Sequence, residues 1–153
     1  MREGRSLYLL FRLGEPLYGL AIEHVVEVLR MAALLSLPHA PAWLLGCLNL
    51  RGQVLPVLDL ARRLGLPGVP IHLDTPVIVV GVEGRSVGLV VTSVCDVAAL
   101  PEPEEGRWVT HQDEQLVLLL DPAPLVAESY AWLERPRAGA ASWADPHSRA
   151  AFP

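Results

Sequence analysis

Residues 45–59 read Leu45-Gly46-Cys47-Leu48-Asn49-Leu50-Arg51-Gly52-Gln53-Val54-Leu55-Pro56-Val57-Leu58-Asp59. Two strongly apolar segments flank a polar turn, Asn49–Gln53, and Gly52 allows the positive φ that a tight turn requires. Pro56 has no backbone N–H to donate, so its strand is expected at a sheet edge or beside a bulge. The stretch therefore predicts two antiparallel strands joined by a tight turn.

Arg51 is the unusual residue of this turn, because hairpin geometry alone does not require an arginine. Two interpretations are open. Arg51 is either a solvated turn residue, or it is held by an acidic side chain beside an interaction surface, with Glu27 the best candidate for that acid.

The chain contains an internal repeat. Three strand-like blocks beginning at Leu9, Tyr18 and Val25 match blocks 69 positions later (78 − 9, 87 − 18 and 94 − 25). Residues 53–59 match residues 115–121 at an offset of 62 (115 − 53), so the second repeat has lost seven residues (69 − 62). Short β-branched and leucine-rich runs at this spacing predict an all-β protein of two small barrels that share one core, since neither repeat alone buries enough surface.

In both repeats the last strand ends in an aspartate, Asp59 or Asp121, that is followed by a short helical stretch. Aspartate is a good helix N-cap, because its carboxylate accepts the free N–H groups of the first turn. Pro122 suits the first helical position. We expect helix caps here; a direct contact with a partner and an aspartic-protease pair are the alternatives. Residues 42–45 are expected to form one helical turn.

Bulk composition excludes several classes of protein. Of the 153 residues 52% are hydrophobic and 19% charged, which is typical of a folded chain with a sizeable core. The net charge is −5 and the arginines are dispersed, so a nucleic-acid partner is not expected. The apolar runs are strand-length and no signal peptide is recognised, which indicates a cytoplasmic protein. Cys47 and Cys95 are expected to be buried reduced thiols, with a disulfide or a reactive thiol as alternatives.

We expect one domain at residues 1–133, followed by a Pro/Ala-rich flexible tail at 134–153 in which Trp143 and Phe152 are candidates for docking. Its first barrel is expected mainly at 16–75, and its second mainly at 76–126 with a contribution from the N-terminal strand.

No catalytic, metal or cofactor motif is recognised. The five histidines do not pair at metal-ligand spacing, and neither a glycine-rich phosphate loop nor a nucleophile elbow is present. We therefore expect no enzymatic activity, no metal and no cofactor. A small-molecule sensor that uses the cleft between the barrels is an alternative to a protein-interaction module.

The sequence resembles the CheW-type coupling domains of bacterial chemotaxis. The resemblance rests on Gly46, the run Asn49-Leu50-Arg51-Gly52, Pro56-Val57 and Asp59-Leu60, and it extends over roughly residues 6–126. Further matches occur in the early and later strands: Tyr18-Gly19-Leu20, Val26-Glu27-Val28-Leu29-Arg30, Val87-Gly88-Leu89-Val90-Val91 and Val94-Cys95-Asp96-Val97.

The resemblance implies two SH3-like five-stranded β-barrels and a non-catalytic adaptor that links chemoreceptor tips to the regulatory domain of the histidine kinase CheA. An adaptor of a twitching-motility system or of another receptor–kinase array is an alternative. The segment 100–106 is shorter than is usual in the family, which puts the partner contacts of that loop in question. Carried over position by position, the resemblance implies partner-binding roles for Glu27, Gly46, Asn49, Arg51, Gly52, Val87 and Gly88.

Overall fold

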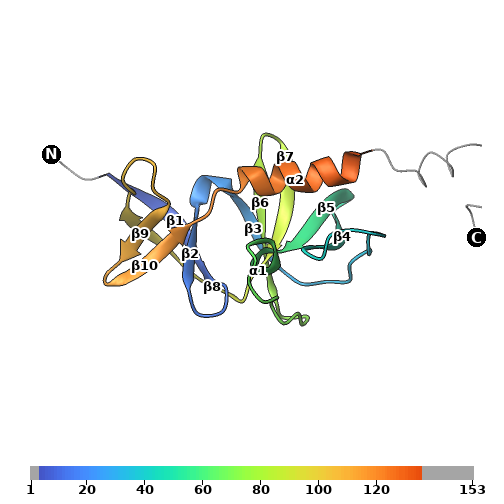
Figure 1. The fold of residues 1–153 in the computed structure, drawn as a ribbon, viewed down its shortest axis with the longest axis horizontal. Helices are drawn as coiled ribbons and strands as arrows, with labels where there is room; N and C mark the ends of the chain where they lie inside the picture. Colours follow the sequence, from blue (N-terminus) through green and yellow to red (C-terminus); the bar gives the residue numbers. More distant parts are fainter. Residues whose placement is uncertain (1–3, 136–153) are drawn as a thin grey trace, which may run out of the picture.

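The structure is a computed structural model that describes residues 4–135, and two five-stranded sheets make up most of it (Figure 1). The N-terminal sheet has the strand order β8-β1-β2-β10-β9, and the central sheet has the order β3-β6-β7-β5-β4. The N-terminal sheet consists of β1 (Arg5–Arg12), β2 (Leu17–Ala21), β8 (Ser93–Pro101), β9 (Val109–Gln112) and β10 (Gln115–Leu119). The central sheet consists of β3 (Val25–Arg30), β4 (Leu44–Leu50), β5 (Gln53–Asp59), β6 (Pro76–Val82) and β7 (Arg85–Val90). The helices are η1 (Ile22–His24), α1 (Leu60–Arg63) and α2 (Ala123–Glu134).

The two repeats exchange strands. The β1–β2 hairpin of the first repeat lies between β8 and β10 of the second repeat, and the β6–β7 hairpin of the second lies between β3 and β5 of the first. The observed sheets therefore do not follow the predicted barrel boundaries of 16–75 and 76–126. Sequence similarity identifies equivalent strands, but the backbone hydrogen bonds of a strand edge are the same whichever hairpin they join, so similarity does not reveal the exchange.

The strand pairing repeats the sequence offsets residue by residue. Gly19 lies opposite Leu10 on β1 and Leu119 on β10, and Gly88 lies opposite Val79 on β6 and Val57 on β5. A Cβ on Gly88 would lie 2.7 Å from the Val77 Cγ1 atom, and one on Gly19 would lie 3.1 Å from the Leu119 Cδ2 atom. At both equivalent positions side chains of neighbouring strands occupy the space that a larger residue would need.

Equivalent β-bulges interrupt the β3–β6 pair of the central sheet and the β1–β8 pair of the N-terminal sheet. The register shifts between Val25 and Glu27 in the β3–β6 pair, and opposite Leu10 and Phe11 in the β1–β8 pair. The bulge turns the skipped residue Cys95 outward, so its predicted burial is wrong, whereas Cys47 is buried as predicted. Both cysteines are free thiols.

One apolar core joins the two sheets, as predicted. Phe11 and Leu20 of the N-terminal sheet pack with Val57, Ile78 and Leu89 of the central sheet, and all five side chains are fully buried. A smaller cluster fills the interior of the N-terminal sheet: Tyr8, Leu10, Leu17, Leu100 and Val117. The hydroxyl of Thr110 on β9 donates to the carbonyl of Pro101 on β8, which ties the two outer strands of this sheet together.

Asp59 ends β5 and caps α1 as expected, whereas Asp121 lies two residues after β10 and Pro122 stands at the N-cap of α2. Asp59 is buried, and its carboxylate accepts the backbone N–H groups of Arg62 and Val69. The Asp121 carboxylate accepts the N–H of Ala123, and α2 begins one residue later than predicted. The helical turn expected at residues 42–45 is wrong, because the chain forms a turn at 42–43 and then enters β4.

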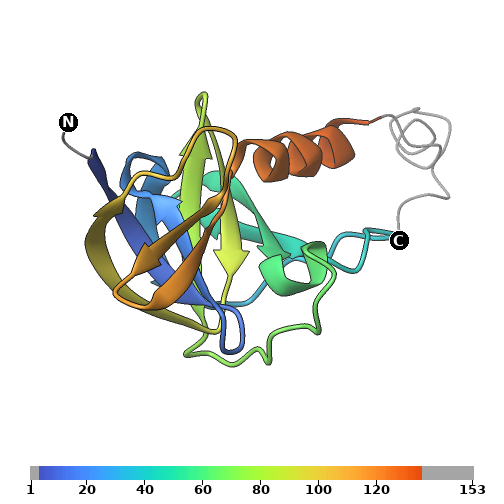
Figure 2. The same cartoon turned by 60° about the vertical axis from the view of Figure 1, so that its left-hand side comes forward.

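The helix α2 runs along the central sheet near β6 and β7 (Figure 2). Leu125, Val126 and Trp132 are its buried apolar side chains. Its outer face is held by Arg63 of α1, which makes two hydrogen bonds of 2.6 Å to the Glu128 carboxylate. These bonds lower the pKa of Glu128 and raise that of Arg63.

The helix α2 extends through residue 134, the first residue of the predicted tail. Glu134 is the last residue of α2, where its carboxylate pairs with Arg85 on β7 at 2.8 Å. Residues 136–153, with Trp143 and Phe152, lie outside the described part of the chain. Among the described helices none is both long and apolar enough to cross a membrane.

We expect Gly88→Ala to lower the free energy of unfolding by about 1–3 kcal/mol, because the added Cβ overpacks β7 against Val77. The matched control is Gly19→Ala in the equivalent position, where the nearest atom is the Leu119 Cδ2 at 3.1 Å on a partly exposed side chain. Chemical denaturation of the two variants checks this. Equal losses at both positions would contradict the packing described here.

We expect Glu128→Gln to lower the melting temperature at pH 7, by a free energy of at most about 1 kcal/mol because the pair is partly exposed. The Glu128 pKa is lower in the folded protein than its ordinary value of 4.5, so the ionised carboxylate stabilises the fold above that pH. The difference between the variant and the parent protein should therefore shrink as the pH falls below 4.5. A difference independent of pH between 7 and 3 would refute the assignment.

Candidate functional site

The β4–β5 turn presents Arg51 in a fixed backbone conformation. Leu50 pairs with Gln53, and the two residues between them, Arg51 and Gly52, have φ values of 52° and 83°. Positive φ at both central residues characterises the tight hairpin turn that matches the twist of the strands, and glycine adopts it without strain. The Asn49 side-chain oxygen accepts the Gly52 N–H at 2.9 Å and holds the turn closed. The sequence prediction of a tight turn with positive φ at Gly52 is confirmed.

The Arg51 guanidinium donates to the Glu27 carboxylate on β3 and forms an ion pair with it. β3 and β4 are the two outer strands of the central sheet, and Arg51 lies in the turn that follows β4. The ion pair between Arg51 and Glu27 therefore links the two edges of the sheet. Glu27 is therefore the acid that holds Arg51, and the interaction surface expected beside the pair stays a prediction. The Glu27 side chain is 28% exposed and that of Arg51 68% exposed, so the arginine stays largely accessible.

A cavity of about 330 Å³ opens beside this pair, here called the Glu27–Arg51 cavity. Its lining comes from β3, the β4–β5 hairpin, the β6–β7 hairpin and α2: Val26, Glu27, Leu50, Arg51, Gln53, Val54, Leu55, Val79, Gly84, Ser86 and Tyr130. Two valines of its lining are exposed although they are apolar, namely Val26 (57%) and Val54 (66%). An exposed apolar patch with a polar margin is typical of a protein-interaction site.

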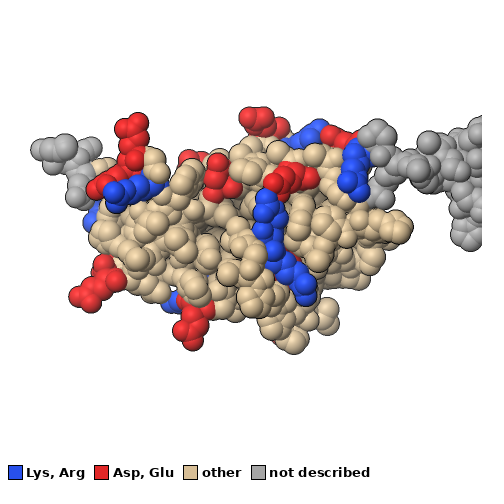
Figure 3. Space-filling view, viewed as in Figure 1, with Lys and Arg blue, Asp and Glu red and all other residues tan. Residues whose placement is uncertain are grey.

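The α2 side of the cavity is fixed by polar contacts of Tyr130. The Tyr130 hydroxyl donates to the Ser86 carbonyl at 2.9 Å, and the Arg85 guanidinium lies 4.7 Å from the centre of the tyrosine ring. Arg85 in turn pairs with Glu134. The cavity thus has ion pairs near two of its sides and apolar side chains between them. Figure 3 shows one face of the molecule, on which most of the surface is uncharged and several arginine side chains touch acidic ones.

The structure brings four of the predicted site residues together: Glu27, Asn49, Arg51 and Gly52. Gly46 lies elsewhere on β4, buried against the Leu35 carbonyl where a Cβ has no room. Val87 and Gly88 are buried in β7, and their surroundings are core side chains.

Sequence reasoning predicted Glu27 and Arg51 and missed the other residues that line the cavity, among them Tyr130, Ser86 and Val54. Val54 carried a usable signal, since it follows the polar turn and alternates with the buried Leu55. Tyr130 carried none, because the face against which α2 packs depends on the tertiary structure.

Among residues 4–135 no group of three or more His, Cys, Asp or Glu side chains is placed to hold a metal ion. The Glu27–Arg51 pair is already neutralised and open to solvent. The arrangement is therefore suited to binding a protein surface by apolar contact with directed hydrogen bonds.

The fold and the site together define a small all-β docking module made of two strand-exchanged barrels. The chain belongs to the CheW-like domain family, whose pattern matches residues 7–129. It is accordingly a chemotaxis coupling adaptor.

Individual relatives agree with this assignment. A probable chemotaxis protein CheW of Rhizobium etli is 32% identical over 127 residues, 79% of this chain and 82% of the relative. Protein FrzA of Myxococcus xanthus is 40% identical over 92 residues, 60% of this chain and 57% of the relative. The crystal structure of the scaffolding protein TtCheW from Thermoanaerobacter tengcongensis superposes with a TM-score of 0.68 at 27% identity, covering 77% of this chain and 90% of that one.

We expect the Glu27–Arg51 pair to contribute about 0.2–1 kcal/mol to the free energy of unfolding, because Arg51 is largely exposed. A double-mutant cycle of Glu27→Ala, Arg51→Ala and the combined variant, followed by chemical denaturation, measures this coupling. The coupling should weaken as salt is added. A coupling of about 3 kcal/mol or more would mean that the pair is buried in solution.

Proposed function

We propose that this adaptor is non-catalytic and cytoplasmic, and that it links chemoreceptor tips to the regulatory domain of a CheA-type histidine kinase through the Glu27–Arg51 cavity. The observation that carries the proposal is an accessible arginine, oriented by an acid, next to a patch of exposed valines. Arginine is enriched among the energetically important residues of protein interfaces.

The chemistry of Arg51 supports a direct contact with a partner. A guanidinium has five N–H donors, and Glu27 accepts from the Nη2 of Arg51. Further donors remain for carbonyl or carboxylate groups of a docked protein. Because the turn holds the backbone and Glu27 holds the side chain, little conformational entropy is lost on binding. Val87 and Gly88 are buried, so the proposed docking surface does not include them.

An adaptor needs a second surface for its second partner, and the N-terminal sheet offers one. Val109 on β9 lies opposite Leu118 on β10, with Leu116 nearby on the same strand. The three side chains are 38%, 40% and 67% exposed, respectively. This β9–β10 patch belongs to the other sheet, so the two surfaces leave room for simultaneous binding of two proteins.

The receptor pathway has a second candidate. Relatives named FrzA, from Myxococcus xanthus, and PilI, from Pseudomonas aeruginosa, stand beside the chemotaxis proteins named CheW. An adaptor of another receptor–kinase array, such as one for twitching motility, uses the same fold and the same cavity. Binding to receptor tips and kinases of each array from the same genome distinguishes the two pathways.

We expect Arg51→Ala to weaken binding of one partner at least tenfold while the fold stays intact, because truncating an arginine that acts as a hot spot costs about 2 kcal/mol or more. Calorimetric titration with the purified kinase regulatory domain, and separately with a receptor-tip fragment, measures the affinities. The matched control is Arg107→Ala, which removes another exposed arginine, paired with Glu104 in the connection between β8 and β9. The control should bind both partners as the parent protein does.

The charge-swapped variant, Glu27→Arg with Arg51→Glu, separates pairing from direct contact. Restored affinity would show that the pair itself holds the docking surface in shape. Affinity that stays low would show that the partner contacts the guanidinium directly. Unchanged affinity of Arg51→Ala for both partners would exclude the Glu27–Arg51 cavity as a docking site.

A further inference from the structure

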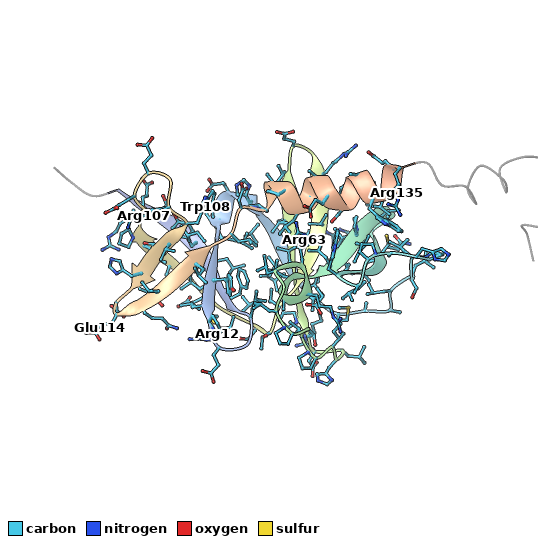
Figure 4. The ribbon with its side chains drawn as sticks, viewed as in Figure 1. Arg12, Arg63, Arg107, Trp108, Glu114 and Arg135 are labelled. Atoms are coloured by element: carbon cyan, nitrogen blue, oxygen red, sulfur yellow. The ribbon has the colours of Figure 1, made fainter. Side chains whose placement is uncertain are left out.

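The connection between β8 and β9 helps to form two adjoining pockets on the N-terminal sheet. One measures about 250 Å³ and is here called the Trp108 pocket; the other measures about 480 Å³ and is here called the Glu102 pocket. Pro103 and Arg107 belong to both linings, so the two pockets share a wall. Figure 4 shows Arg107 and Trp108 close together at one rim of this sheet. Of the β9–β10 patch only Val109 reaches the Glu102 pocket, and none of it lines the Trp108 pocket.

The connection has a fixed shape. The Arg107 N–H donates to the Glu104 carbonyl at 2.9 Å, and Gly106 between them has a φ of 79°. Positive φ at the third residue of a closed turn is typical of a type II turn, and glycine adopts it without strain. After the turn, the Trp108 carbonyl accepts the Leu119 N–H at 2.8 Å. The pocket walls are therefore held in place without a ligand.

The Trp108 pocket is largely apolar. Its apolar walls include aromatic, proline and leucine side chains: Tyr8, Pro103, Trp108, Leu119, Leu120 and Pro122. Trp108 is 55% exposed, and its indole N–H has no hydrogen-bond partner among residues 4–135. Tyr8 is buried, and this burial raises the pKa of its hydroxyl, so the wall stays uncharged. The pocket thus offers flat apolar surface beside an unpaired donor.

An extended proline-rich segment matches these features. A polyproline II helix has no internal hydrogen bonds, so its carbonyl oxygens are free to accept the Trp108 N–H. Proline has no N–H, so an apolar pocket leaves no donor of such a ligand unpaired. An α-helix is about 10–12 Å wide with its side chains and already pairs its own carbonyls, so it gains nothing from this donor. Grooves lined by aromatic side chains are a recurrent binding site for polyproline II segments.

The Glu102 pocket adds a preference for positive charge. Three acids and one arginine line the two pockets, which gives a net charge of −2 (1 − 3) with histidine neutral. Glu104 is paired with Arg107 at 3.4 Å. The exposed Glu102 carboxylate accepts the Ser6 hydroxyl at 2.7 Å and forms no ion pair within residues 4–135. Its charge is therefore open to a basic side chain, and the arginine fork suits a carboxylate best.

We propose that the two pockets bind a proline-rich segment of a partner protein, with a proline in the Trp108 pocket and an adjacent arginine on Glu102. A polyproline II segment is already extended before it binds, so it loses little conformational entropy and a short contact suffices. This site does not depend on either docking surface proposed above for the adaptor.

The test titrates the full chain with synthetic peptides by calorimetry. The probes are a polyproline peptide that ends in arginine, the same peptide ending in glutamate, and an arginine peptide in which alanine replaces every proline. The arginine peptide should bind more tightly than the glutamate peptide, and the alanine peptide should not bind. In NMR spectra the indole N–H signal of Trp108 should shift on adding the arginine peptide, whereas those of Trp43 and Trp132 should stay in place.

Variants assign the contacts. Trp108→Ala should weaken binding of the arginine peptide about tenfold or more, because a tryptophan that anchors a ligand is typically a hot spot. Trp108→Phe keeps a ring without the donor and should give an intermediate affinity. Glu102→Gln should weaken binding about two- to fivefold, as expected for an exposed ion pair. The matched control is Leu73→Ala, which removes a 76% exposed side chain outside both linings and should bind as the parent protein does.

Several outcomes would overturn the proposal. These are unchanged affinity in Trp108→Ala, equal binding of the alanine peptide, and no binding of either proline-rich peptide by the folded parent protein. A glutamate peptide that binds as tightly as the arginine peptide would contradict the role of Glu102. A Trp108 signal that stays in place while the arginine peptide binds would put the site elsewhere, even if the Trp108 variants fail to fold.

Discussion

The structure depends on the exchange of strands between the two repeats. Each hairpin, β1–β2 or β6–β7, has both of its edges covered by strands of the other repeat. The backbone N–H and C=O groups of a hairpin edge must be paired once they are buried, so neither repeat satisfies its own hydrogen bonds when it folds alone. The shared core has the same consequence, since Phe11 and Leu20 complete the packing around the central sheet. The two barrels therefore form one cooperative unit.

The exchange also creates the candidate site. Glu27 belongs to the first repeat and follows the β1–β2 hairpin closely in sequence, but β3 crosses to the central sheet and pairs with β6. In the central sheet Glu27 contacts Arg51, which lies in the turn after β4, the other outer strand of the same sheet. Had β3 stayed beside its own hairpin, the acid and the arginine would stand on different sheets.

The N-terminal sheet has the same geometry without the same chemistry. Asp96 stands 69 positions after Glu27, and Asp113 stands 62 positions after Arg51, so the equivalent positions carry two acids. Two like charges cannot form the bridge that Glu27 and Arg51 form in the central sheet. The N-terminal sheet is tied instead by the hydrogen bond from Thr110 to Pro101, and its exposed surface is apolar along β9 and β10. The two halves of the repeat thus carry different surfaces.

The sequence by itself determined the local features of this protein: the all-β class, the tight turn at Gly52, the Asp59 cap and the repeat with its offsets. These depend on neighbouring residues, through backbone φ preferences, N-cap hydrogen bonds and the alternation of apolar side chains. It also offered Glu27 as the best candidate for an acid that holds Arg51, with a solvated arginine as the alternative. Only the tertiary structure decided which hairpin each strand joins, that Cys95 faces outward at a bulge, that Val87 and Gly88 are core residues, and that Tyr130 completes the cavity. Strand edges carry the same hydrogen-bonding groups in every pairing, so the choice among them is made by packing across the whole core.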